Sequence, residues 1–384
     1  MSYPITATAI ANCLGTEATA VFERAFAGTT GFIPVKQVYD VAFDTVVGEM
    51  PELPTGDTLG CAMTRIATLV LASARQLRPA VHAAAARWGP RRVAYVFASS
   101  TGGIEATERT LSPLVALPAG PAYHYANHGI DATSNAVTAY FGIAGVTLAI
   151  STACSSGIKA LSSAVRLLDR GLADAVVVGS ADSLSRTTLF GFHSLGLTAP
   201  AATRPFSKDR AGITLGEGSA FVLLERTGEA IASLGGVGVG SDAYHHTTPH
   251  PDAIGGMIAM REALDRAKLS PNLISYVSAH GTGTVQNDAT EALAIRSVFE
   301  RAVPVTATKS LTGHTLGTAG LTSVVLAIES LCRQAIPPTL RYSPDPALGV
   351  TIVDAAARAQ LDHVLVNAFG FGGSNASAVI SRTP

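Results

Sequence analysis

The stretch Ser151-Thr152-Ala153-Cys154-Ser155-Ser156-Gly157 lies where an apolar run of this 384-residue chain passes into a helical pattern. The apolar run Val146 to Ile150 before it is typical of a strand. After it, apolar residues recur at spacings of three and four from Ile158 to Leu168, which places them on one face of a helix. The segment therefore predicts a strand, a turn of small residues, and a helix that begins close to Cys154.

The same alternation of apolar runs and helical patterns continues along the whole chain. It predicts an α/β fold in which helices cover the sheets. The polar stretch Glu225 to Ser233 is the nearest thing to a boundary, and we divide the chain there into halves 1–228 and 229–384. Each half shows a similar order of elements, which fits an old duplication whose sequences have diverged. The other predicted strands are Val93 to Phe97, Ala175 to Val178, Phe221 to Leu224, Ile274 to Val277, Val303 to Ala307 and Val364 to Val366.

The chain contains few charged residues. Apolar residues make up 47% of the chain and charged residues only 14%, so we expect surface to be hidden between subunits of an oligomer. The net charge of −1 gives no field that would attract nucleic acid or anionic lipid. The N-terminus lacks a signal-peptide pattern, and no window of roughly 18 residues is continuously apolar. We expect a cytoplasmic protein without a membrane span.

Four cysteines, Cys13, Cys61, Cys154 and Cys332, lie far apart and form no CxxC pair. Cys154 differs from the other three because a helix N-terminus follows it directly. The partial positive charge of that terminus favours a thiolate, which is the reactive form of cysteine. The turn alone is equally compatible with a buried structural cysteine. We interpret the other three cysteines as structural.

Two histidines follow predicted strands. His280 comes after the strand 274–278, in a loop where Gly281 and Gly283 allow close approach of the backbone to a ligand. The hydroxyls of Thr282 and Thr284 in this loop are suited to bond an amide-bearing arm such as phosphopantetheine. A second unit of this kind runs from Lys309 to His314, after the strand 303–307. The histidines lie 314 − 280 = 34 residues apart without an HxxxH spacing, so we predict no metal site.

Four short runs carry a resemblance to a known family: STACSSG at 151–157, AHGTGT at 279–284, KSLTGH at 309–314 and NAFGFGGSNAS at 367–377. Together they resemble the signature regions of the elongating β-ketoacyl-acyl carrier protein synthases of the Cys-His-His type, in the thiolase superfamily. Further matches follow in order along the chain, among them Thr203-Arg204-Pro205-Phe206 and Ile336-Pro337-Pro338-Thr339. The first hundred or so residues match diffusely.

The resemblance implies a thiolase-like fold, a five-layered αβαβα body with two pseudo-symmetric halves, usually assembled as a dimer. It implies an acyltransferase, a 3-oxoacyl-[acyl-carrier-protein] synthase, that elongates a fatty acid, polyketide or polyene chain. An acyl group passes from acyl carrier protein to the enzyme, and malonyl-carrier protein then loses carbon dioxide and attacks it. The resemblance implies no cofactor beyond the phosphopantetheine arm of the carrier protein.

The matching motifs also imply residue roles. Cys154 would carry the acyl group, and the backbone N–H groups of Cys154 and Phe371 would hold the oxyanion. His280 and His314 would act as neutral N–H donors to the enolate, and Lys309 would orient or polarise them. A glycine loop with Phe371 as its gate would cover the acyl chamber. The loop comprises Phe369, Gly370, Phe371 and Gly372.

Three positions depart from the pattern of the family. Ser323 stands where a Glu usually partners the lysine at position 309, so a role that depends on a Lys-Glu pair is in doubt. Ser207 stands where Asp is common, and Arg341 where Asn is common. The chain is also short for the family, which suggests a trimmed loop or cap near the acyl pocket or dimer surface.

Alternatives of several classes remain. The chain is either a self-sufficient enzyme or one member of a heterodimer, active or non-catalytic, and retention of Cys154, His280 and His314 disfavours the non-catalytic one. A thiolase or starter-unit synthase would need a second Cys or an Asn in its later motifs. A cysteine peptidase would need surroundings that are absent here. Arg65, Arg204 and Lys208 are candidates for carrier-protein docking. Chain length, saturation and starter unit depend on the shape of the pocket.

Overall fold

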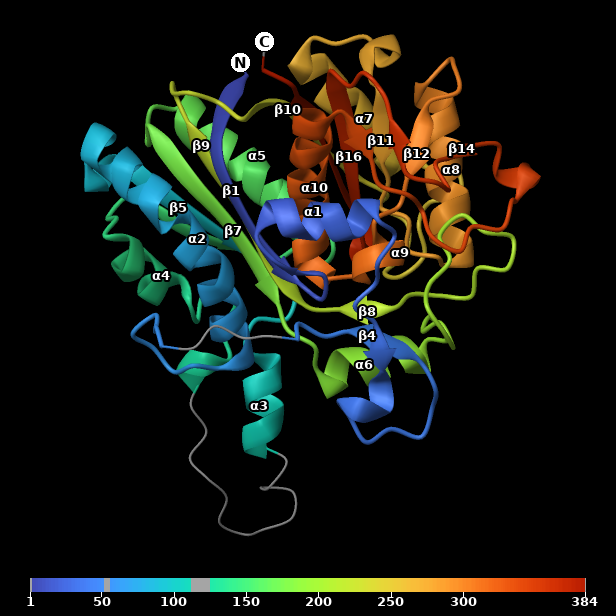
Figure 1. Ribbon diagram of the computed structural model, residues 1–384, viewed down its shortest axis with the longest axis horizontal. Coiled ribbons are helices and arrows are strands. Elements are labelled where there is room, and N and C mark those ends of the chain that lie inside the picture. The colour runs from blue at the N-terminus through green and yellow to red at the C-terminus, as the bar shows by residue number, and fades with distance from the viewer. Residues whose placement is uncertain (1, 52–55, 112–124, 384) are drawn as a thin grey trace.

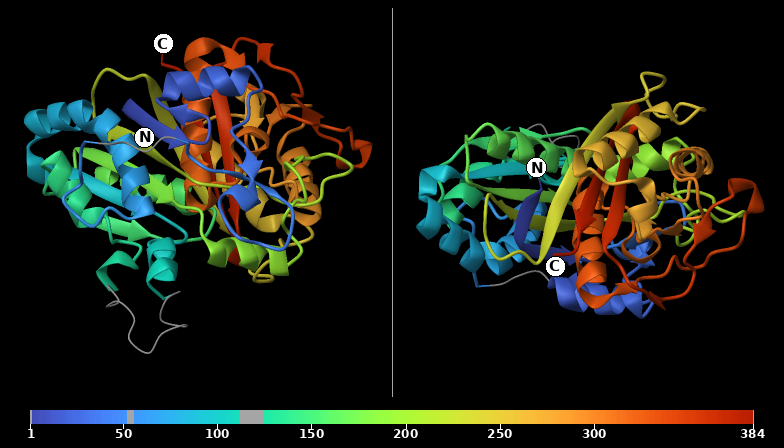
Figure 2. Two further views of the ribbon diagram at one scale, coloured as in Figure 1. Left: turned by 60° about the horizontal axis from the view of Figure 1, so that its bottom comes forward. Right: turned by 90° about the horizontal axis from the view of Figure 1, so that it is seen from above.

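The computed structural model describes residues 2–51, 56–111 and 125–383. Its elements form five layers, in which helices and sheets alternate (Figures 1 and 2). Helix α2 (Arg65–Trp88) covers the outer face of the first sheet, and α7 (Ile254–Ala267) with α8 (Val285–Val298) covers the outer face of the second. Helices α5 (Ser156–Asp169) and α10 (Ala319–Arg333) lie between the sheets. The predicted five-layered αβαβα fold is confirmed.

The two halves repeat one strand order. In each half the first strand pairs antiparallel with the fifth, the fifth pairs antiparallel with the fourth, and the fourth, second and third are parallel neighbours. The first half contains, in spatial order, β1 (Tyr3–Asn12), β9 (Gly218–Glu225), β7 (Ala175–Asp182), β5 (Val93–Ala98) and β6 (Thr147–Ile150). The second contains β10 (Ala232–Ser241), β17 (Ser374–Ser381), β16 (His363–Gly370), β11 (Tyr276–Ser278) and β12 (Pro304–Thr306), followed at its edge by β14 (Thr351–Ile352).

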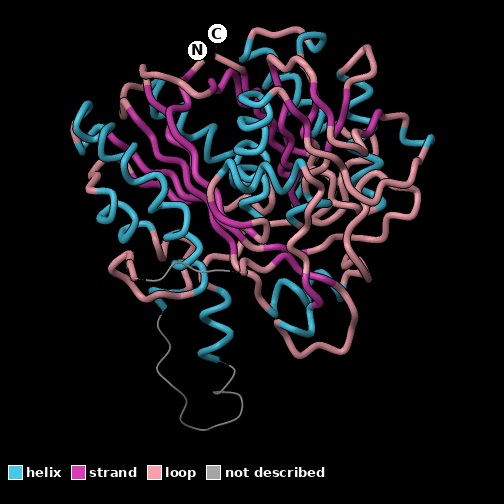
Figure 3. The backbone as a smooth tube through the Cα atoms, in the orientation of Figure 1, coloured by secondary structure: helices cyan, strands magenta, loops and turns pink. Residues whose placement is uncertain are grey.

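The two sheets are joined along one strand. Residues Tyr3–Ile5 of β1 pair with Ala232–Leu234 of β10, while the rest of β1 pairs with β9. Strands of both halves therefore form one continuous ladder, which Figure 3 shows in magenta between the helices. The boundary at 228/229 falls in the link between β9 and β10. As a division into domains it stays a prediction.

The remaining elements are short and lie around these layers. They are β2 (Gly15–Thr16), α1 (Ala18–Phe26), β3 (Ile33–Pro34), β4 (Val46–Gly48), α3 (Ile104–Leu111), α4 (Ser134–Phe141), α6 (Arg186–Ser194), β8 (Leu215–Gly216), α9 (Lys309–Thr312), β13 (Ala335–Ile336) and β15 (Ala357–Arg358). One stretch of the described residues, Leu316–Arg333, has the length and apolarity of a membrane span. It contains α10, and 83% of it is buried inside the protein.

Glycines decide how closely the layers approach. A Cβ on Gly236, Gly238 or Gly240 of β10 would lie 2.3, 2.0 or 2.1 Å from a carbonyl oxygen of α7, so the helix rests directly on the strand. In the central layer, a Cβ on Gly157 would lie 3.0 Å from the backbone nitrogen of Leu321. Helices α5 and α10 therefore meet backbone to backbone, and each begins at a loop of the candidate site.

Replacing Gly157 by Val should lower the free energy of unfolding by about 2 kcal/mol, because the added side chain meets backbone atoms that have no room to move. Urea unfolding followed by circular dichroism measures the change. Gly191 of α6 has no atom within 4 Å of a built Cβ, so Gly191→Ala is the control and should be neutral or stabilising by up to about 1 kcal/mol. An unchanged unfolding midpoint for Gly157→Val would contradict the close contact.

Candidate active site

The turn at Cys154 is held in a strained conformation by its neighbours. Ala153 has a φ of 51°, which a residue with a side chain rarely adopts. The Ser156 hydroxyl accepts a hydrogen bond from Thr152 N–H at 2.8 Å and donates one to the Ala153 carbonyl at 2.5 Å. These bonds lock a sharp elbow between β6 and α5 and present Cys154, which is 7% exposed, beside the first turn of the helix.

Two buried carboxylates on α8 hold the loop of His280. Glu291 accepts the backbone N–H groups of His280 and Gly281 at 2.7 and 2.8 Å. Asp288 accepts those of Thr282 and Gly283, at 3.0 and 3.2 Å. Burial raises the pKa of both carboxyl groups, and their hydrogen bonds lower it. The loop is fixed through its backbone, which leaves the imidazole free to face the cavity.

His314 is fixed through its own backbone. Its N–H donates to the Thr214 carbonyl at 2.7 Å, and its carbonyl accepts from Gly216 N–H at 3.0 Å. The residue follows α9 and lies just before α10, in the same place of the second half that Cys154 occupies in the first. The pseudo-symmetry of the fold thus brings the two loops together between the sheets.

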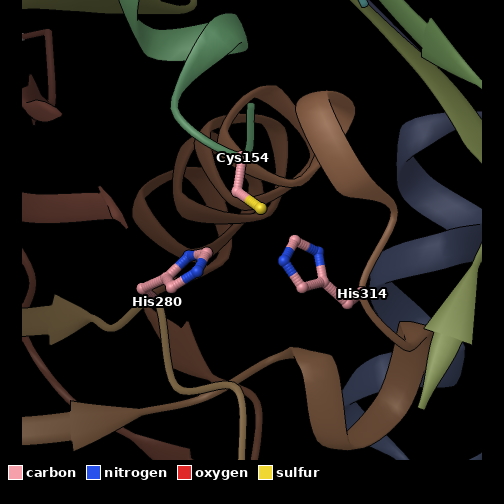
Figure 4. Close-up of side chains that lie close together, drawn as sticks. All are labelled: Cys154, His280 and His314. Carbon is pink, nitrogen blue, oxygen red and sulfur yellow. The ribbon is translucent and has the colours of Figure 1, made fainter. Parts of the chain in front are cut away.

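The structure gathers Cys154, His280 and His314 from three distant segments (Figure 4). The two imidazole rings lie on either side of the sulfur, with centroids 5.2 Å apart and planes at 84°. The sulfur and one nitrogen of each ring lie within 4.8 Å of one another. These atoms are also close enough to share a metal ion, and the absence of a metal stays a prediction.

Hydrogen bonds fix the tautomer of both rings. Leu316 N–H donates to His314 Nδ1 at 3.1 Å, and the Lys309 ammonium lies 3.1 Å from His280 Nδ1. A neutral imidazole that accepts at Nδ1 carries its proton on Nε2. Burial lowers the pKa of both histidines well below its usual value, and the Lys309 charge lowers it further. The site therefore contains two neutral Nε2–H donors.

Burial also decides the state of Cys154. It raises the pKa of the thiol to about 11, although Lys309 and the backbone N–H groups of Phe371 and Cys154 lower it. The thiolate predicted from the helix terminus is wrong for the free protein, because removing the sulfur from water outweighs the local dipole. The two N–H groups that favour the anion are those predicted to form an oxyanion hole.

Lys309 is buried, and its partners differ from the Lys-Glu pair of the family. Its Nζ lies against the ring and donates to the carbonyl of His280 at 2.5 Å. Ser323 instead lies 3.5 Å from the Thr308 hydroxyl. Burial lowers the pKa of Lys309 to about 8, while Glu291 raises it. The negative charge that supports this lysine comes from α8.

One cavity contains most of the predicted site. Cys154, His280 and His314 line it together with Thr282 and Thr284, whose hydroxyls lie 3.0 Å apart. Thr284 Oγ1 also accepts from Asn287 N–H and caps α8, so its role is structural in part. Of the glycine loop, Phe369 lies in strand β16 rather than in the loop, and Gly370 ends that strand. The turn itself comprises Phe371–Gly373.

The sequence did not identify several residues that position the site. Glu291 and Asp288 received no role from the sequence, and their partners are backbone N–H groups in the loop that precedes α8. Phe192 of α6 packs on Phe371, with ring centroids 5.6 Å apart, and lines the cavity. Asp242 accepts from Gly255 N–H and from the Asn375 amide beside the glycine turn. Acidic residues in the first two turns of a helix after a Gly-rich loop were the available signal for the first two.

Comparison with known proteins matches two family models to this chain. The β-ketoacyl synthase N-terminal domain matches residues 61–230, and the β-ketoacyl synthase C-terminal domain matches residues 231–343. Together they cover more than half of the chain. The chain belongs to the β-ketoacyl synthase family.

Individual relatives agree with this assignment. The 3-oxoacyl-[acyl-carrier-protein] synthase 2 of Vibrio cholerae is 37% identical over 63% of this chain and 63% of its own length. That of Coxiella burnetii is 29% identical over 98% of both chains. A chain from the complex of the ketosynthase ApeO with its chain length factor ApeC, from Xenorhabdus doucetiae, matches with 33% identity, covers 100% of this chain and 98% of its own, and gives a TM-score of 0.92. This β-ketoacyl synthase is an acyltransferase with the thiolase-like fold.

Alkylation of Cys154 should show that its resting form is the thiol. With a pKa of about 11, the thiolate fraction grows about tenfold with each pH unit between 7 and 9, and the rate of reaction with iodoacetamide should grow with it. Mass spectrometry of the peptide that contains Cys154 measures this rate. Exposed Cys332 in the same sample controls for reagent and pH. A rate that reaches a plateau below pH 8 would indicate a thiolate and contradict the assignment.

Proposed function

We propose that this β-ketoacyl synthase joins carbon units by decarboxylative Claisen condensation, with Cys154 as acyl carrier and with His280 and His314 as enolate donors. The observation that carries the proposal is that the Cys154 sulfur and one ring nitrogen each of His280 and His314 lie within 4.8 Å of one another at a shared cavity. Two neutral donors suit a reaction that develops negative charge on a carbonyl oxygen.

In the first stage the Cys154 sulfur attacks the acyl thioester of the carrier protein. A bond forms between the Cys154 sulfur and the acyl carbon. The oxyanion that results accepts hydrogen bonds from the backbone N–H groups of Cys154 and Phe371. The bond to the pantetheine sulfur then breaks, and that sulfur takes the proton that Cys154 gives up. The Cys154 thiol and the carrier-protein thioester become a Cys154 thioester and a pantetheine thiol. This stage therefore has no net uptake or release of protons and does not require a thiolate at rest.

In the second stage malonyl-carrier protein places its thioester oxygen against the Nε2–H groups of His280 and His314. The bond to the free carboxylate breaks, carbon dioxide leaves, and the electron pair forms an enolate at that oxygen. The enolate carbon attacks the acyl carbonyl on Cys154, and the carbon–sulfur bond breaks. The departing thiolate takes a proton from water, because the pKa of the Cys154 thiol is about 11. Lys309 keeps the ring of His280 in the tautomer that donates.

Replacing His280 or His314 by Ala should lower decarboxylation of malonyl-carrier protein by about 100-fold or more, since each change removes one donor to the enolate. Loading of Cys154 should stay within about threefold, because backbone N–H groups serve that step. Carbon dioxide release and the mass of the acylated Cys154 peptide measure the two steps. Cys154→Ala is the reciprocal control, which should abolish loading and keep decarboxylation. Equal loss of both steps in the histidine variants would show that their role is misplaced.

We also propose that strand β6 pairs with a second chain of the same fold. β6 pairs with β5 on one side and is the last strand of its sheet, and Val146 and Leu148 are 38% and 37% exposed there. An apolar edge strand is ready to pair with another chain. The match to a complex of a ketosynthase with a chain length factor favours a non-identical partner of this class, with an identical chain as the other outcome.

Leu148→Arg should separate such a dimer, because it places a charge in an apolar strand contact. We expect its dissociation constant to rise at least about tenfold, measured by analytical ultracentrifugation with and without the candidate partner. Leu273, which is 53% exposed and lies in a short helical turn before β11, gives the control variant Leu273→Arg. A dimer that tolerates Leu148→Arg would place the contact elsewhere.

We propose an acyl carrier protein as the substrate-bearing partner, the phosphopantetheine arm as the carrier of all acyl groups, and no further cofactor. Arg65 is removed from the docking candidates because it pairs with the buried Glu217. Arg204 pairs with Asp209, and Lys208 is exposed.

The four cysteines are free, which fits the reducing conditions of the cytoplasm, where we place the protein.

A further inference from the structure

Lys159 lies on α5, one helical turn beyond Cys154, and the reaction proposed above gives it no task. Its ammonium is half-buried and donates a hydrogen bond to the Ser374 hydroxyl at 2.5 Å. Burial lowers its pKa, and the neighbouring charge acting on it is another cation, Arg166. Among the residues that the structure describes, no carboxylate pairs with this ammonium, and a partly desolvated charge without such a partner costs free energy. The position of Lys159 therefore needs a reason other than stability.

The bond from Lys159 begins a chain of hydroxyl groups that ends at the nucleophile elbow. The Ser374 and Ser155 hydroxyls lie 3.1 Å apart, and Ser155 donates to the Thr152 carbonyl at 2.8 Å. Each hydroxyl has one proton to donate. Because Lys159 can only donate, Ser374 accepts from it and donates to Ser155, which donates to Thr152. The ammonium fixes the first bond of the chain, and the Thr152 carbonyl, which can only accept, fixes the other two.

Ser374 is the fixed end of the glycine turn. It pairs across the hairpin with Gly370, and the residues between them are Phe371–Gly373. Gly372 and Gly373 have φ angles of 78° and 68°, so the turn depends on both glycines. The N–H of Phe371 faces the Cys154 sulfur from this turn. A shift of Ser374 would move that N–H relative to the sulfur.

The far side of the turn has anchors of its own. Gly372 N–H donates to the His246 carbonyl at 2.8 Å, and the Gly373 carbonyl accepts from Asp242 N–H at 2.9 Å. These bonds tie the turn to the loop that follows β10. Lys159 and the hydroxyl chain tie its other end to α5, the helix that carries the nucleophile. The turn is therefore held between two separate parts of the protein.

We propose that Lys159 is a positioning residue that fastens Ser374 to the nucleophile elbow and thereby sets the distance between the Phe371 N–H group and the Cys154 sulfur. The inference deepens the proposed function, since it assigns the part of the chain that aligns the oxyanion hole for acyl loading. Lys159 acts through Ser374 and Phe371 and does not touch the substrate.

The test compares Lys159→Met, Lys159→Arg, Ser374→Ala and the double variant Lys159→Met/Ser374→Ala in the full-length protein. Hydrogen–deuterium exchange of the peptide around residues 369–375, read by mass spectrometry, reports the turn directly and needs no activity. Acyl loading of Cys154 from an acylated carrier protein, read as kcat and KM, reports the oxyanion hole. Lys36→Met, which removes an exposed lysine paired with Asp44, is the matched control.

We expect Lys159→Met and Ser374→Ala to speed exchange of this peptide and to lower the kcat of loading about tenfold, as for loss of one charge-assisted hydrogen bond. KM for the carrier protein should not change, because docking is not touched. The double variant should be no slower than either single variant, since both remove the same bond. Lys159→Arg should restore loading and exchange, because a guanidinium also donates. Thermal midpoints should stay within about 2 °C of the parent protein.

Three outcomes would overturn the inference: unchanged exchange and loading in Lys159→Met, additive losses in the double variant, or failure of Arg to restore either readout. Failure of the proposed function is distinguishable from these. In that case the parent protein neither loads Cys154 nor condenses malonyl-carrier protein, while the exchange data still decide whether Lys159 fastens the turn.

Discussion

The candidate site depends on the contact between α5 and α10 at Gly157 and Gly320. A Cβ on Gly157 would lie 3.0 Å from the Leu321 nitrogen, and one on Gly320 would lie 2.9 Å from the Ile158 side chain. Because both positions are glycines without side chains, the first turns of the two helices are in contact. Cys154 precedes one helix and His314 precedes the other, so the contact of the helices is also the contact of the two reactive groups. A side chain that pushed the helices apart would also move Cys154 away from His314.

Burial then sets the protonation state of the groups that this contact brings together. His280 and His314 are neutral, the Cys154 thiol keeps its proton, and the pKa of Lys309 falls to about 8. The causes are the same for all four groups, because a dry site penalises every charge. A charge that appears during the reaction is stabilised by fixed donors instead, which need no rearrangement when it forms. The site is thus arranged for transient anions and contains no resident thiolate.

The sequence predicts strands and helices well where the pattern of apolar residues is simple. All seven predicted strands occur, and the helix after Cys154 begins close to its predicted start. Strand β10 was missed because Gly236, Gly238 and Gly240 replace the apolar side chains that mark a strand. Their reason is tertiary, since α7 occupies the space that side chains would fill. No local pattern contains that information.

The same limit applies to the site. Motifs predicted which side chains meet, because their identity and order along the chain carry the resemblance to the family. The state of Cys154 was predicted wrongly, because the helix terminus is a local feature whereas desolvation depends on everything that packs around the sulfur. The roles of Glu291 and Asp288 were missed for a related reason. Their carboxylates are satisfied by backbone N–H groups, so the only signal in the sequence is an acidic residue early in a helix, which names no partner.

Ser323 shows how the site is balanced without the acid that the family usually has there. With Ser323 bonded toward Thr308, the charge of Lys309 is supported by Glu291 and Asp288, whose oxygens already bind the backbone of residues 280–283. That support is shared, so the Lys309 ammonium loses its proton near pH 8, well below the usual value for lysine. A carboxylate at position 323 would add a negative charge and raise this pKa. The serine therefore leaves the pKa of Lys309 at about 8, and the Lys309 ammonium, still the main form at pH 7, lies 3.1 Å from Nδ1 of His280.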